Sequence, residues 1–308
     1  MTDSADFALP FRIEGQNVNG RIVKLNQLAS DVLSRHNYPE EVGRLLGEAL
    51  VLAAMLGTVL KFDGRFILQL QGKGPISMLM GDYAQGGALR GFAQFDQEKL
   101  DAALANGDSG LALLGANGHM AFTVDQGADM ERYQGIVPLE GENLAQAALE
   151  YFHRSEQIAT SLRLAAAPMI LPGGKTEWRA GGILLQQAAK DGGTDSPPDR
   201  ELRVESDDWQ RLTILLQTTE DSELLDAELE AETLAYRLFN EDGVRVFDAR
   251  PLHFDCPCSR DRVKNMLSGL SETDQDEMQE QETIEVRCEF CNELYLFSPT
   301  EAFSASGA

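Results

Sequence analysis

Hydrophobic and polar residues in the first part of the chain predict strands arranged around one buried helix. The mixed apolar and polar positions of residues 10–35 predict one or two strands and then a short helix near Leu28–Leu33. The stretch Asn37-Tyr38-Pro39-Glu40-Glu41 predicts the start of a long helix, because proline and acidic residues are favoured in a first turn. From Leu45 to Leu60 this helix is apolar on nearly all sides, so we expect it to be buried.

Short apolar runs separated by glycine-rich turns follow this helix and predict an antiparallel meander. A later helix is expected over Leu144–Phe152, where apolar residues recur at helical spacing. Residues 1–190 are therefore expected to form an α+β body, with an antiparallel sheet packed on the buried helix. The expected strands lie at 66–70, 76–80, 88–95, 120–124 and 181–185.

Residues 191–240 have a different pattern and are expected to form a flexible, partly helical linker. Residues 191–199 are rich in Gly, Ser, Pro and Asp, which is typical of a connecting segment. Two amphipathic helices are expected after it. The apolar face of the first contains Trp209, Leu212, Leu215 and Leu216, and that of the second contains Leu224, Ala227, Ala231, Leu234, Ala235 and Leu238.

The other face of the second expected helix is almost entirely acidic, and no base occurs between Arg211 and Arg237. Like charges at i,i+4, such as Asp226 with Glu230, each cost about 0.2–0.5 kcal/mol. This helix is therefore expected to be marginal by itself and to need a docking surface for its apolar stripe.

The charge distribution separates the body from the rest of the chain. The net charge of −24 divides into −5 for residues 1–190, which hold 21 acids and 16 bases, and −19 for residues 191–308, which hold 29 acids and 10 bases. A surface this acidic repels phosphate backbones and anionic lipids, so we expect neither nucleic acid nor membrane as a partner. The N-terminus has no signal-peptide pattern, and Leu45–Leu60 contains Glu48 and is too short to span a bilayer, which together indicate a cytoplasmic protein.

All four cysteines lie near the C-terminus in two close pairs, Cys256-Pro257-Cys258 and Cys288-Glu289-Phe290-Cys291, with 29 residues between the pairs. This spacing suits one tetrahedral zinc ion per chain, bound by four thiolates in a closed, structural site. The small domain expected over residues 241–300 is too short for a good core, so metal binding would contribute much of its stability.

The same spacing lets each pair close into a disulfide, so a static zinc ribbon and a redox switch both fit it. Nearby bases would favour the thiolate form of the cysteines. A disulfide sulfur is a far weaker zinc ligand than a thiolate, so forming Cys256–Cys258 or Cys288–Cys291 would expel the metal and unfold the domain. The preceding helices would then lose their docking surface. The bases are Arg250, Arg260, Arg262, Lys264 and Arg287.

Motifs from residue 20 to about 300 make the chain resemble the redox-regulated heat-shock chaperones of the bacterial cytosol, the 33-kilodalton heat-shock proteins. The motifs of the body are moderately specific one by one, and together with the two cysteine pairs they are highly specific. They are His36-Asn37-Tyr38-Pro39, Leu60-Lys61-Phe62-Asp63-Gly64, Leu68-Gln69-Leu70-Gln71-Gly72-Lys73-Gly74-Pro75, Glu131-Arg132-Tyr133-Gln134-Gly135, Tyr151-Phe152-His153-Arg154-Ser155-Glu156-Gln157, Gly181-Gly182-Ile183-Leu184-Leu185-Gln186, Phe254-Asp255-Cys256-Pro257-Cys258-Ser259-Arg260 and Cys288-Glu289-Phe290-Cys291.

The resemblance implies a chaperone and not an enzyme. It implies that the reduced, zinc-bound protein has little activity, and that oxidation forms a disulfide within each pair and releases zinc. The small domain and the linker would then unfold and bind unfolding client proteins without ATP, and the active form would be a homodimer. By position, the resemblance assigns the zinc and sensor roles to the four cysteines. It assigns gating and client binding to linker residues Trp209, Leu212, Leu215, Leu216, Leu224, Leu234 and Leu238.

Three other functions fit the residues less well. Gly173-Gly174-Lys175-Thr176 resembles the end of a phosphate loop, but the pattern requires Gly where Met169 stands, so we interpret the stretch as a turn. In a thiol–disulfide oxidoreductase, a C-x-x-C motif normally begins a helix beside a βαβ unit, whereas Cys288-x-x-Cys291 lies in a small acidic C-terminal part. A nucleic-acid-binding zinc ribbon is opposed by the acidic C-terminal part. His253 lies three residues before Cys256 and is expected beside the metal site or at the surface.

Overall fold

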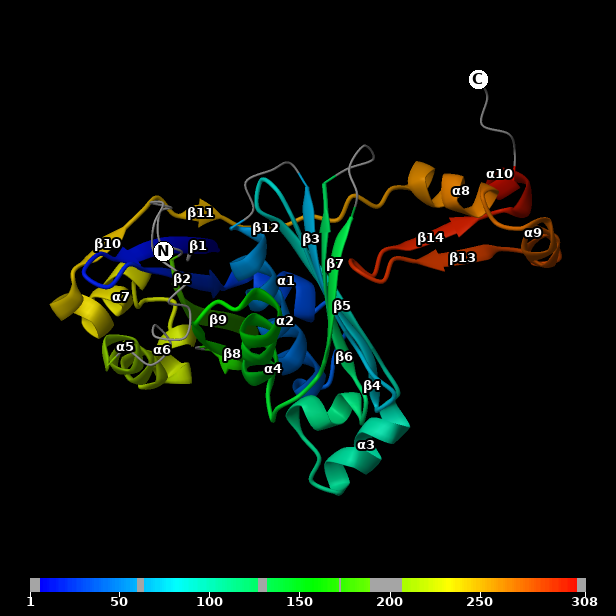
Figure 1. Cartoon of the computed structure of the whole chain (residues 1–308). Coiled ribbons are helices and arrows are strands. Elements are labelled where there is room, and N and C mark those ends of the chain that lie inside the picture. The colour runs from blue at the N-terminus through cyan, green and yellow to red at the C-terminus, as the bar shows by residue number, and fades with distance from the viewer. Residues whose placement is uncertain (1–5, 60–63, 127–131, 172, 189–206, 304–308) are drawn as a thin grey trace. The chain divides into compact units, whose positions relative to one another are not determined.

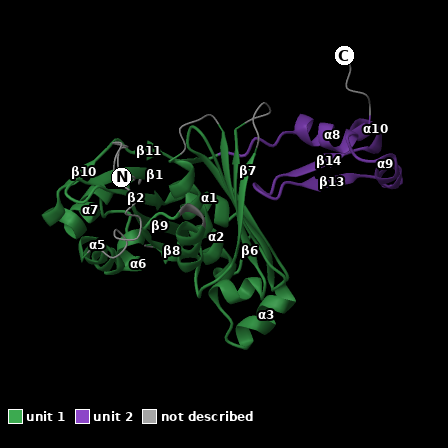
Figure 2. Cartoon of the chain, viewed as in Figure 1, with its two compact units in different colours: residues 1–254 green, residues 255–308 purple. Residues whose placement is uncertain are grey.

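The computed structural model describes the chain except for residues 1–5, 60–63, 127–131, 172, 189–206 and 304–308 (Figure 1). The chain divides into two compact units, residues 1–254 and residues 255–308 (Figure 2). The sequence suggested three parts with boundaries near 190 and 240. The described part of the expected linker, from residue 207, instead belongs to the first unit, because its apolar faces pack on a sheet there.

One antiparallel sheet, here called sheet A, is formed by strands from both ends of the first unit. Its order is β10-β1-β2-β9-β8, and β11 also pairs with β1. The central pair joins β2 to β9, with Val23 opposite Gly182. The strands are β1 (Phe7–Ile13), β2 (Val18–Leu25), β8 (Thr160–Ile170), β9 (Thr176–Gln187), β10 (Val244–Val246) and β11 (Arg250–Pro251).

The second sheet, sheet B, contains the expected meander in the order β12-β5-β4-β3-β6-β7. All its pairs are antiparallel except β12 with β5, which is parallel. The sequence predicted an antiparallel sheet, and this one exception arises because β12 reaches the edge from a distant part of the chain. The strands are β3 (Arg65–Gln71), β4 (Ile76–Ala84), β5 (Ala88–Phe95), β6 (His119–Asp125), β7 (Tyr133–Pro138) and β12 (His253–Phe254).

Helix α2 (Glu40–Gly57) lies between the two sheets (Figure 1). It packs against β3, β4 and β5 on one side and against β2, β8 and β9 on the other. This position explains why the helix is apolar all round, as the sequence predicted. The approach to sheet A is close: a Cβ atom on Gly47 would lie 2.6 Å from the Cβ of Ala166. Helix α1 (Gln27–Leu33) joins the same core.

The opposite face of sheet A is covered by three short helices, α5 (Asp207–Gln217), α6 (Asp221–Leu225) and α7 (Ala231–Phe239), which we call the acidic layer. Alternation along β1 divides its side chains between the two faces. Leu9, Phe11 and Ile13 pack with the acidic layer, whereas Ala8 packs on the α2 side. Both faces of sheet A are therefore buried.

The prediction of a single helix through Leu224 and Leu238 was wrong, because the structure has α6 and α7 there with a break at residues 226–230. Asp226 has extended backbone angles, and its Oδ1 accepts a hydrogen bond from the Glu228 amide. Lys24 donates to the carbonyl oxygens of Glu223 and Asp226 and so satisfies the end of α6. Local side-chain to backbone bonds of this kind compete with helix continuation.

The remaining elements complete the two units. The Gly174 amide donates to the Leu171 carbonyl oxygen in a tight turn, and Thr176 already begins β9, so this stretch is a turn, as predicted, and not a phosphate loop before a helix. No helix in the described residues is both long and apolar enough to cross a membrane. The first unit also contains α3 (Gln97–Ala105) and α4 (Leu144–Tyr151), and the second contains α8 (Arg260–Ser268), α9 (Glu272–Gln279), β13 (Ile284–Arg287), β14 (Leu294–Phe297) and α10 (Pro299–Phe303).

Candidate metal and redox centre

The second unit has a very small apolar core. The buried residues that form it come from α8, β13, β14 and α10, and α9 contributes none. A core of this size contributes little stability, which is why domains this small usually need a metal or disulfides. Its buried members are Val263, Leu267, Ile284, Phe297 and Ala302.

Two local structures position the cysteines. Cys256 and Cys258 precede α8, whose N-terminus is capped by Ser259, the acceptor of a hydrogen bond from the Arg262 amide. Cys288 and Cys291 lie at the tip of the β13–β14 hairpin. There the Asn292 amide donates to the Cys288 carbonyl oxygen at 2.8 Å, and Asn292 adopts a positive φ of 62°.

The four sulfurs converge, as the spacing predicted. All four Sγ atoms lie within 4.8 Å of one another. Cys256 Sγ is 3.7 Å from Cys288 Sγ, and Cys258 Sγ is 3.2 Å from Cys291 Sγ. Tetrahedral zinc with Zn–S bonds of about 2.3 Å separates its sulfurs by about 3.8 Å. The four free thiols are thus placed to bind one metal ion.

The surroundings shift the pKa values of three thiols in different directions. Burial raises the pKa of Cys256 and of Cys291. Burial also acts to raise the pKa of Cys258, but hydrogen bonds from Tyr295 and from the other cysteines outweigh it and lower that pKa. The Tyr295 hydroxyl donates to Cys258 Sγ at 3.2 Å. The sequence reasoning missed Tyr295, since one tyrosine in the apolar run of β14 carries no specific signal.

Three of the bases expected near the cysteines have hydrogen-bond partners other than the sulfurs. Arg260 pairs with Glu301 and lies over the Phe297 ring, and Arg262 donates to the Pro257 carbonyl oxygen. Arg287 donates to the backbone of Asn292, so it stabilises the hairpin tip. His253 is exposed in β12 and is not among the residues grouped around the possible metal site.

The expected linker residues lie in the acidic layer. Trp209, Leu212, Leu216, Leu224 and Leu234 are buried against sheet A. Leu215 and Leu238 are half-buried and pack on the same cluster. The predicted apolar faces are therefore real, and what they contact is the face of sheet A opposite to α2.

Comparisons with known proteins agree over nearly the whole chain. The family model described as Hsp33 protein matches residues 6–298. The 33 kDa chaperonin of Caulobacter vibrioides is 44% identical over 301 residues, which cover 96% of each chain. The 33 kDa chaperonin of Pseudomonas putida is 38% identical over 298 residues, which cover 96% of this chain and 92% of the relative.

A solved structure has the same fold. The crystal structure of the 33 kDa chaperonin of Thermotoga maritima aligns with a TM-score of 0.76 at 21% identity, covering 97% of this chain and 96% of that one. The names of these relatives describe a chaperone, which is not an enzymatic function. By the family match and by its curated relatives, the chain belongs to the Hsp33 family of chaperones.

Proposed function

We propose that this chain is a redox-gated holdase, an ATP-independent chaperone that is latent when reduced and active when oxidised. The observation that carries the proposal is the convergence of four free thiols in a unit whose apolar core is very small. The fold of such a unit depends on whatever binds its cysteines. A change in cysteine chemistry can therefore change the fold.

Zinc is the metal we propose for the reduced state, because four thiolates favour it and a closed site leaves no open position. When bound, zinc would supply folding stability to the second unit and no catalysis. The ligands would be Cys256, Cys258, Cys288 and Cys291.

Oxidation would proceed within each pair, Cys256 with Cys258 and Cys288 with Cys291. Each pair of thiolates would lose two electrons to one hydrogen peroxide molecule and form one S–S bond, and the peroxide would take up two protons from the solvent and leave as two water molecules. Cys256 Sγ also contacts Cys288 Sγ, and Cys258 Sγ contacts Cys291 Sγ, so forming a disulfide within each pair would break these contacts between the pairs.

The acidic layer would be the gate. Its apolar residues cover one face of sheet A. Its release would expose both these residues and that face of the sheet to an unfolding client. We propose residues 1–190 as the chaperone body, 191–240 as the gating and client-binding linker and 241–300 as the zinc-binding switch. We also propose a homodimer in the oxidised state, a cytoplasmic location, and no role for nucleic acid or membrane.

Light scattering from an unfolding client protein tests the proposal. Reduced, zinc-loaded protein is compared with protein treated with peroxide at elevated temperature, without ATP. We expect only the oxidised protein to suppress aggregation. Equal suppression by both forms would mean a constitutive chaperone with a structural metal, and would contradict the redox gate.

A cysteine variant distinguishes the effect of losing zinc from the effect of oxidation. Cys258→Ser removes one ligand, so we expect the reduced variant to hold less than one zinc per chain and to be partly active without peroxide. Asn265→Ser changes an exposed position on α8 of the same unit and serves as the matched control. Full latency of Cys258→Ser after loss of its zinc would show that the second unit does not gate activity.

A further inference from the structure

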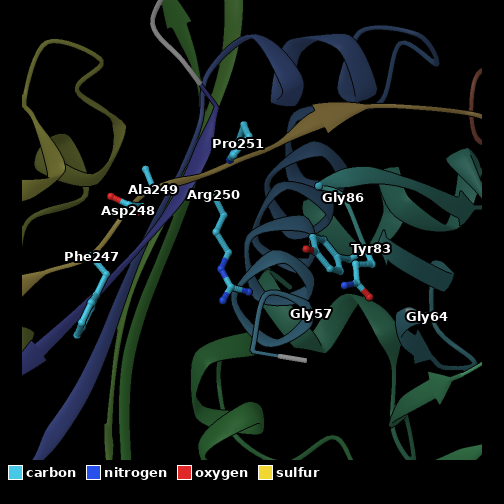
Figure 3. Close-up of a pocket in the computed structure, with 11 residues that line it drawn as sticks. Gly57, Gly64, Tyr83, Gly86, Phe247, Asp248, Ala249, Arg250 and Pro251 are labelled. Carbon is cyan, nitrogen blue, oxygen red and sulfur yellow. The ribbon is translucent and has the colours of Figure 1, made fainter. Parts of the chain in front are cut away.

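A cavity of about 510 Å³ opens at the C-terminal end of α2, entirely within the first unit (Figure 3). One wall is the end of α2 at Gly57 together with Tyr83 and the β4–β5 turn. The opposite wall is the segment 247–251, which includes β11. The size is that of pockets that hold small molecules. Neither the metal centre nor the acidic layer uses this cavity.

The segment that forms the second wall is held firmly against the β4–β5 turn. The His253 amide donates to the Gly87 carbonyl oxygen at 2.9 Å. Gly87 has a φ of +95°, and a Cβ atom there would lie 2.1 Å from the Pro251 carbonyl oxygen. Only glycine therefore permits this approach, and the wall is a built part of the fold.

Two arginines bring positive charge to this part of the first unit. Arg250 extends into the cavity and donates to the Thr58 carbonyl oxygen at the end of α2, and Arg21 donates to the Met55 carbonyl oxygen at 2.9 Å. The Nε of Arg21 is buried and has no hydrogen-bond partner among the described residues. In the part of the chain that the structure describes, no carboxylate lies within ion-pair distance of either guanidinium.

The two charges also act on each other and on Tyr83. Burial, followed by the charge of Arg250, lowers the pKa of Arg21 to about 10. Burial raises the pKa of Tyr83, and the charges of Arg250 and Arg21 oppose that effect. Adjacent like charges without a counter-ion are costly in a partly buried place. An anion that lay between Arg250 and the Tyr83 hydroxyl would remove this cost.

We propose that this cavity binds the phosphate group of a small molecule, with Arg250 as the main ligand, the Tyr83 hydroxyl as a donor and Arg21 as a supporting charge. Guanidinium groups match phosphate oxygens in geometry as well as charge. The Phe247 ring is 44% exposed on the same wall and gives an apolar surface for the rest of the molecule.

The other charges around the cavity do not oppose this assignment. Asp248 belongs to the wall, but its carboxylate points away from the Arg250 guanidinium (Figure 3). The chain as a whole carries −24, so its average surface repels anions. A phosphate is therefore attracted to this cavity by local charges and not by the overall field.

Binding of a phosphate should also affect redox activation, and this expectation rests on the proposed function. A phosphate held by Arg250 and Tyr83 joins the segment 247–251 to the end of α2. This segment lies just before the first cysteine pair in the sequence. A ligand that binds only while the segment is packed against α2 therefore stabilises the latent state by mass action. More oxidant would then be needed to activate the protein.

The test uses reduced full-length protein in a buffer without phosphate, with inorganic phosphate and adenosine monophosphate as probes. Calorimetry and thermal unfolding are measured at constant ionic strength, set with chloride. We expect saturable binding of both probes and a rise in Tm of about 5–10 °C at a hundredfold excess over Kd. We expect succinate, a dicarboxylate of similar charge, to bind at least about tenfold more weakly.

Variants assign the binding to the cavity. Arg250→Met removes the main ligand and is expected to abolish the Tm shift. Tyr83→Phe removes only the hydroxyl and is expected to weaken binding about three- to tenfold even if Arg250→Met fails to fold. Arg44→Gln removes an exposed arginine near the start of α2, whose partner is Glu40 and which is not part of the cavity lining, and should bind like the unmodified protein.

Three results would overturn the proposal. The first is no saturable binding of either probe. The second is binding that Tyr83→Phe and a folded Arg250→Met leave unchanged, because the anion then lies elsewhere. The third is binding that appears only in Asp63→Asn, since Asp63 directly precedes Gly64 of the cavity wall in the sequence and the counter-ion would then belong to the chain itself. Each readout is independent of chaperone activity, so failure of the holdase proposal leaves the binding test intact.

Discussion

Sheet A is covered by helices on both faces, and the two covers differ in charge and in contacts. Helix α2 is apolar nearly all round and has a second sheet on its other side. Beyond its first turn its only acid is Glu48. The acidic layer buries one stripe per helix and exposes acids on the other side. These acids are Asp207, Asp208, Glu220, Asp221, Asp226, Glu228, Glu230 and Glu232.

This difference indicates which of the two helical layers can dissociate from sheet A without unfolding the whole unit. Removing α2 would separate both sheets from their common core, so α2 can open only when the whole unit unfolds. Removing the acidic layer exposes one face of sheet A and relieves repulsion among the acids. Elements with few long-range apolar contacts open at lower free energy than the core. The acidic layer is thus the part of the first unit suited to reversible release.

The largest effect is expected from truncating one buried leucine in each cover. Leu50 of α2 and Leu234 of α7 are both fully buried. Leu50→Ala should lower the free energy of global unfolding by about 3–5 kcal/mol. Leu234→Ala should lower the free energy needed to release the acidic layer from sheet A by about 2–3 kcal/mol.

The two tryptophans separate these outcomes, because Trp209 lies in the acidic layer and Trp178 packs on the α2 side. Urea titrations of Trp178→Phe and Trp209→Phe backgrounds follow one cover each by fluorescence. We expect Leu234→Ala to move the Trp209 transition to lower urea and leave the Trp178 transition in place. Coincident transitions in Leu234→Ala would show that both covers open together.

The two covers were also predicted from the sequence with unequal success. The apolar run Leu45–Leu60 predicted a buried helix, and α2 is one, because a pattern without a polar face leaves no other position. The apolar residues of 224–238 were identified correctly, but the break between α6 and α7 was not. Lys24 causes that break in part from about 200 positions away, which no local pattern contains.

The metal centre was predicted more completely than its surroundings. Cysteine spacing predicted the convergence of four sulfurs, since few other arrangements suit two close pairs. The hydrogen bond from Tyr295 to Cys258 and the pairing of Arg260 with Glu301 depend on how the β13–β14 hairpin meets α8 and α10. Such contacts are tertiary, and their residues have no distinctive spacing.

A close backbone contact offers a second way to loosen only the acidic layer. A Cβ atom on Gly181 of β9 would lie 2.4 Å from the Leu224 carbonyl oxygen of α6. Gly181→Ala should therefore displace α6 at a cost of about 1–3 kcal/mol and raise binding of a hydrophobic dye by the reduced protein. Gly269→Ala, whose Cβ would meet its nearest atom at 3.4 Å, is the control. Unchanged dye binding by Gly181→Ala would mean that α6 adjusts without opening.

Glu48 tests the α2 cover through pH. Burial, and next the charge of Asp221, raises the pKa of Glu48 to about 7 from 4.5. The folded protein therefore binds this proton more tightly than the unfolded chain, and the resulting stability is lost as pH rises through 7. Glu48→Gln should be more stable than the unmodified protein by about 1–3 kcal/mol at pH 8 and nearly equal to it at pH 5. Equal differences at the two pH values, measured by urea unfolding, would contradict ionisation as the cause.

Lys24 tests the acidic layer through pH, with a dependence of the opposite sign to that of Glu48. Its ammonium group is buried in sheet A, beside Asp226 and Arg179, and donates to two carbonyl oxygens of α6 and the following turn. Burial lowers its pKa to about 8 from 10.5, so the open state binds this proton more tightly than the closed state. Closure should therefore strengthen as pH rises from 8 to 10.5, by at most about 1.4 kcal/mol per pH unit.

Lys24→Met removes this dependence. We measure the free energy of the Trp209 transition for the unmodified protein and for Lys24→Met. As pH rises from 8 to 10.5, we expect the unmodified protein to gain stability relative to Lys24→Met. Lys175→Met removes a lysine whose side chain is 73% exposed and should show no such trend. A difference that stayed constant from pH 8 to 10.5 would mean that Lys24 holds α6 through its hydrogen bonds alone. The acidic layer would then be released by breaking those bonds, with no contribution from the charge of Lys24.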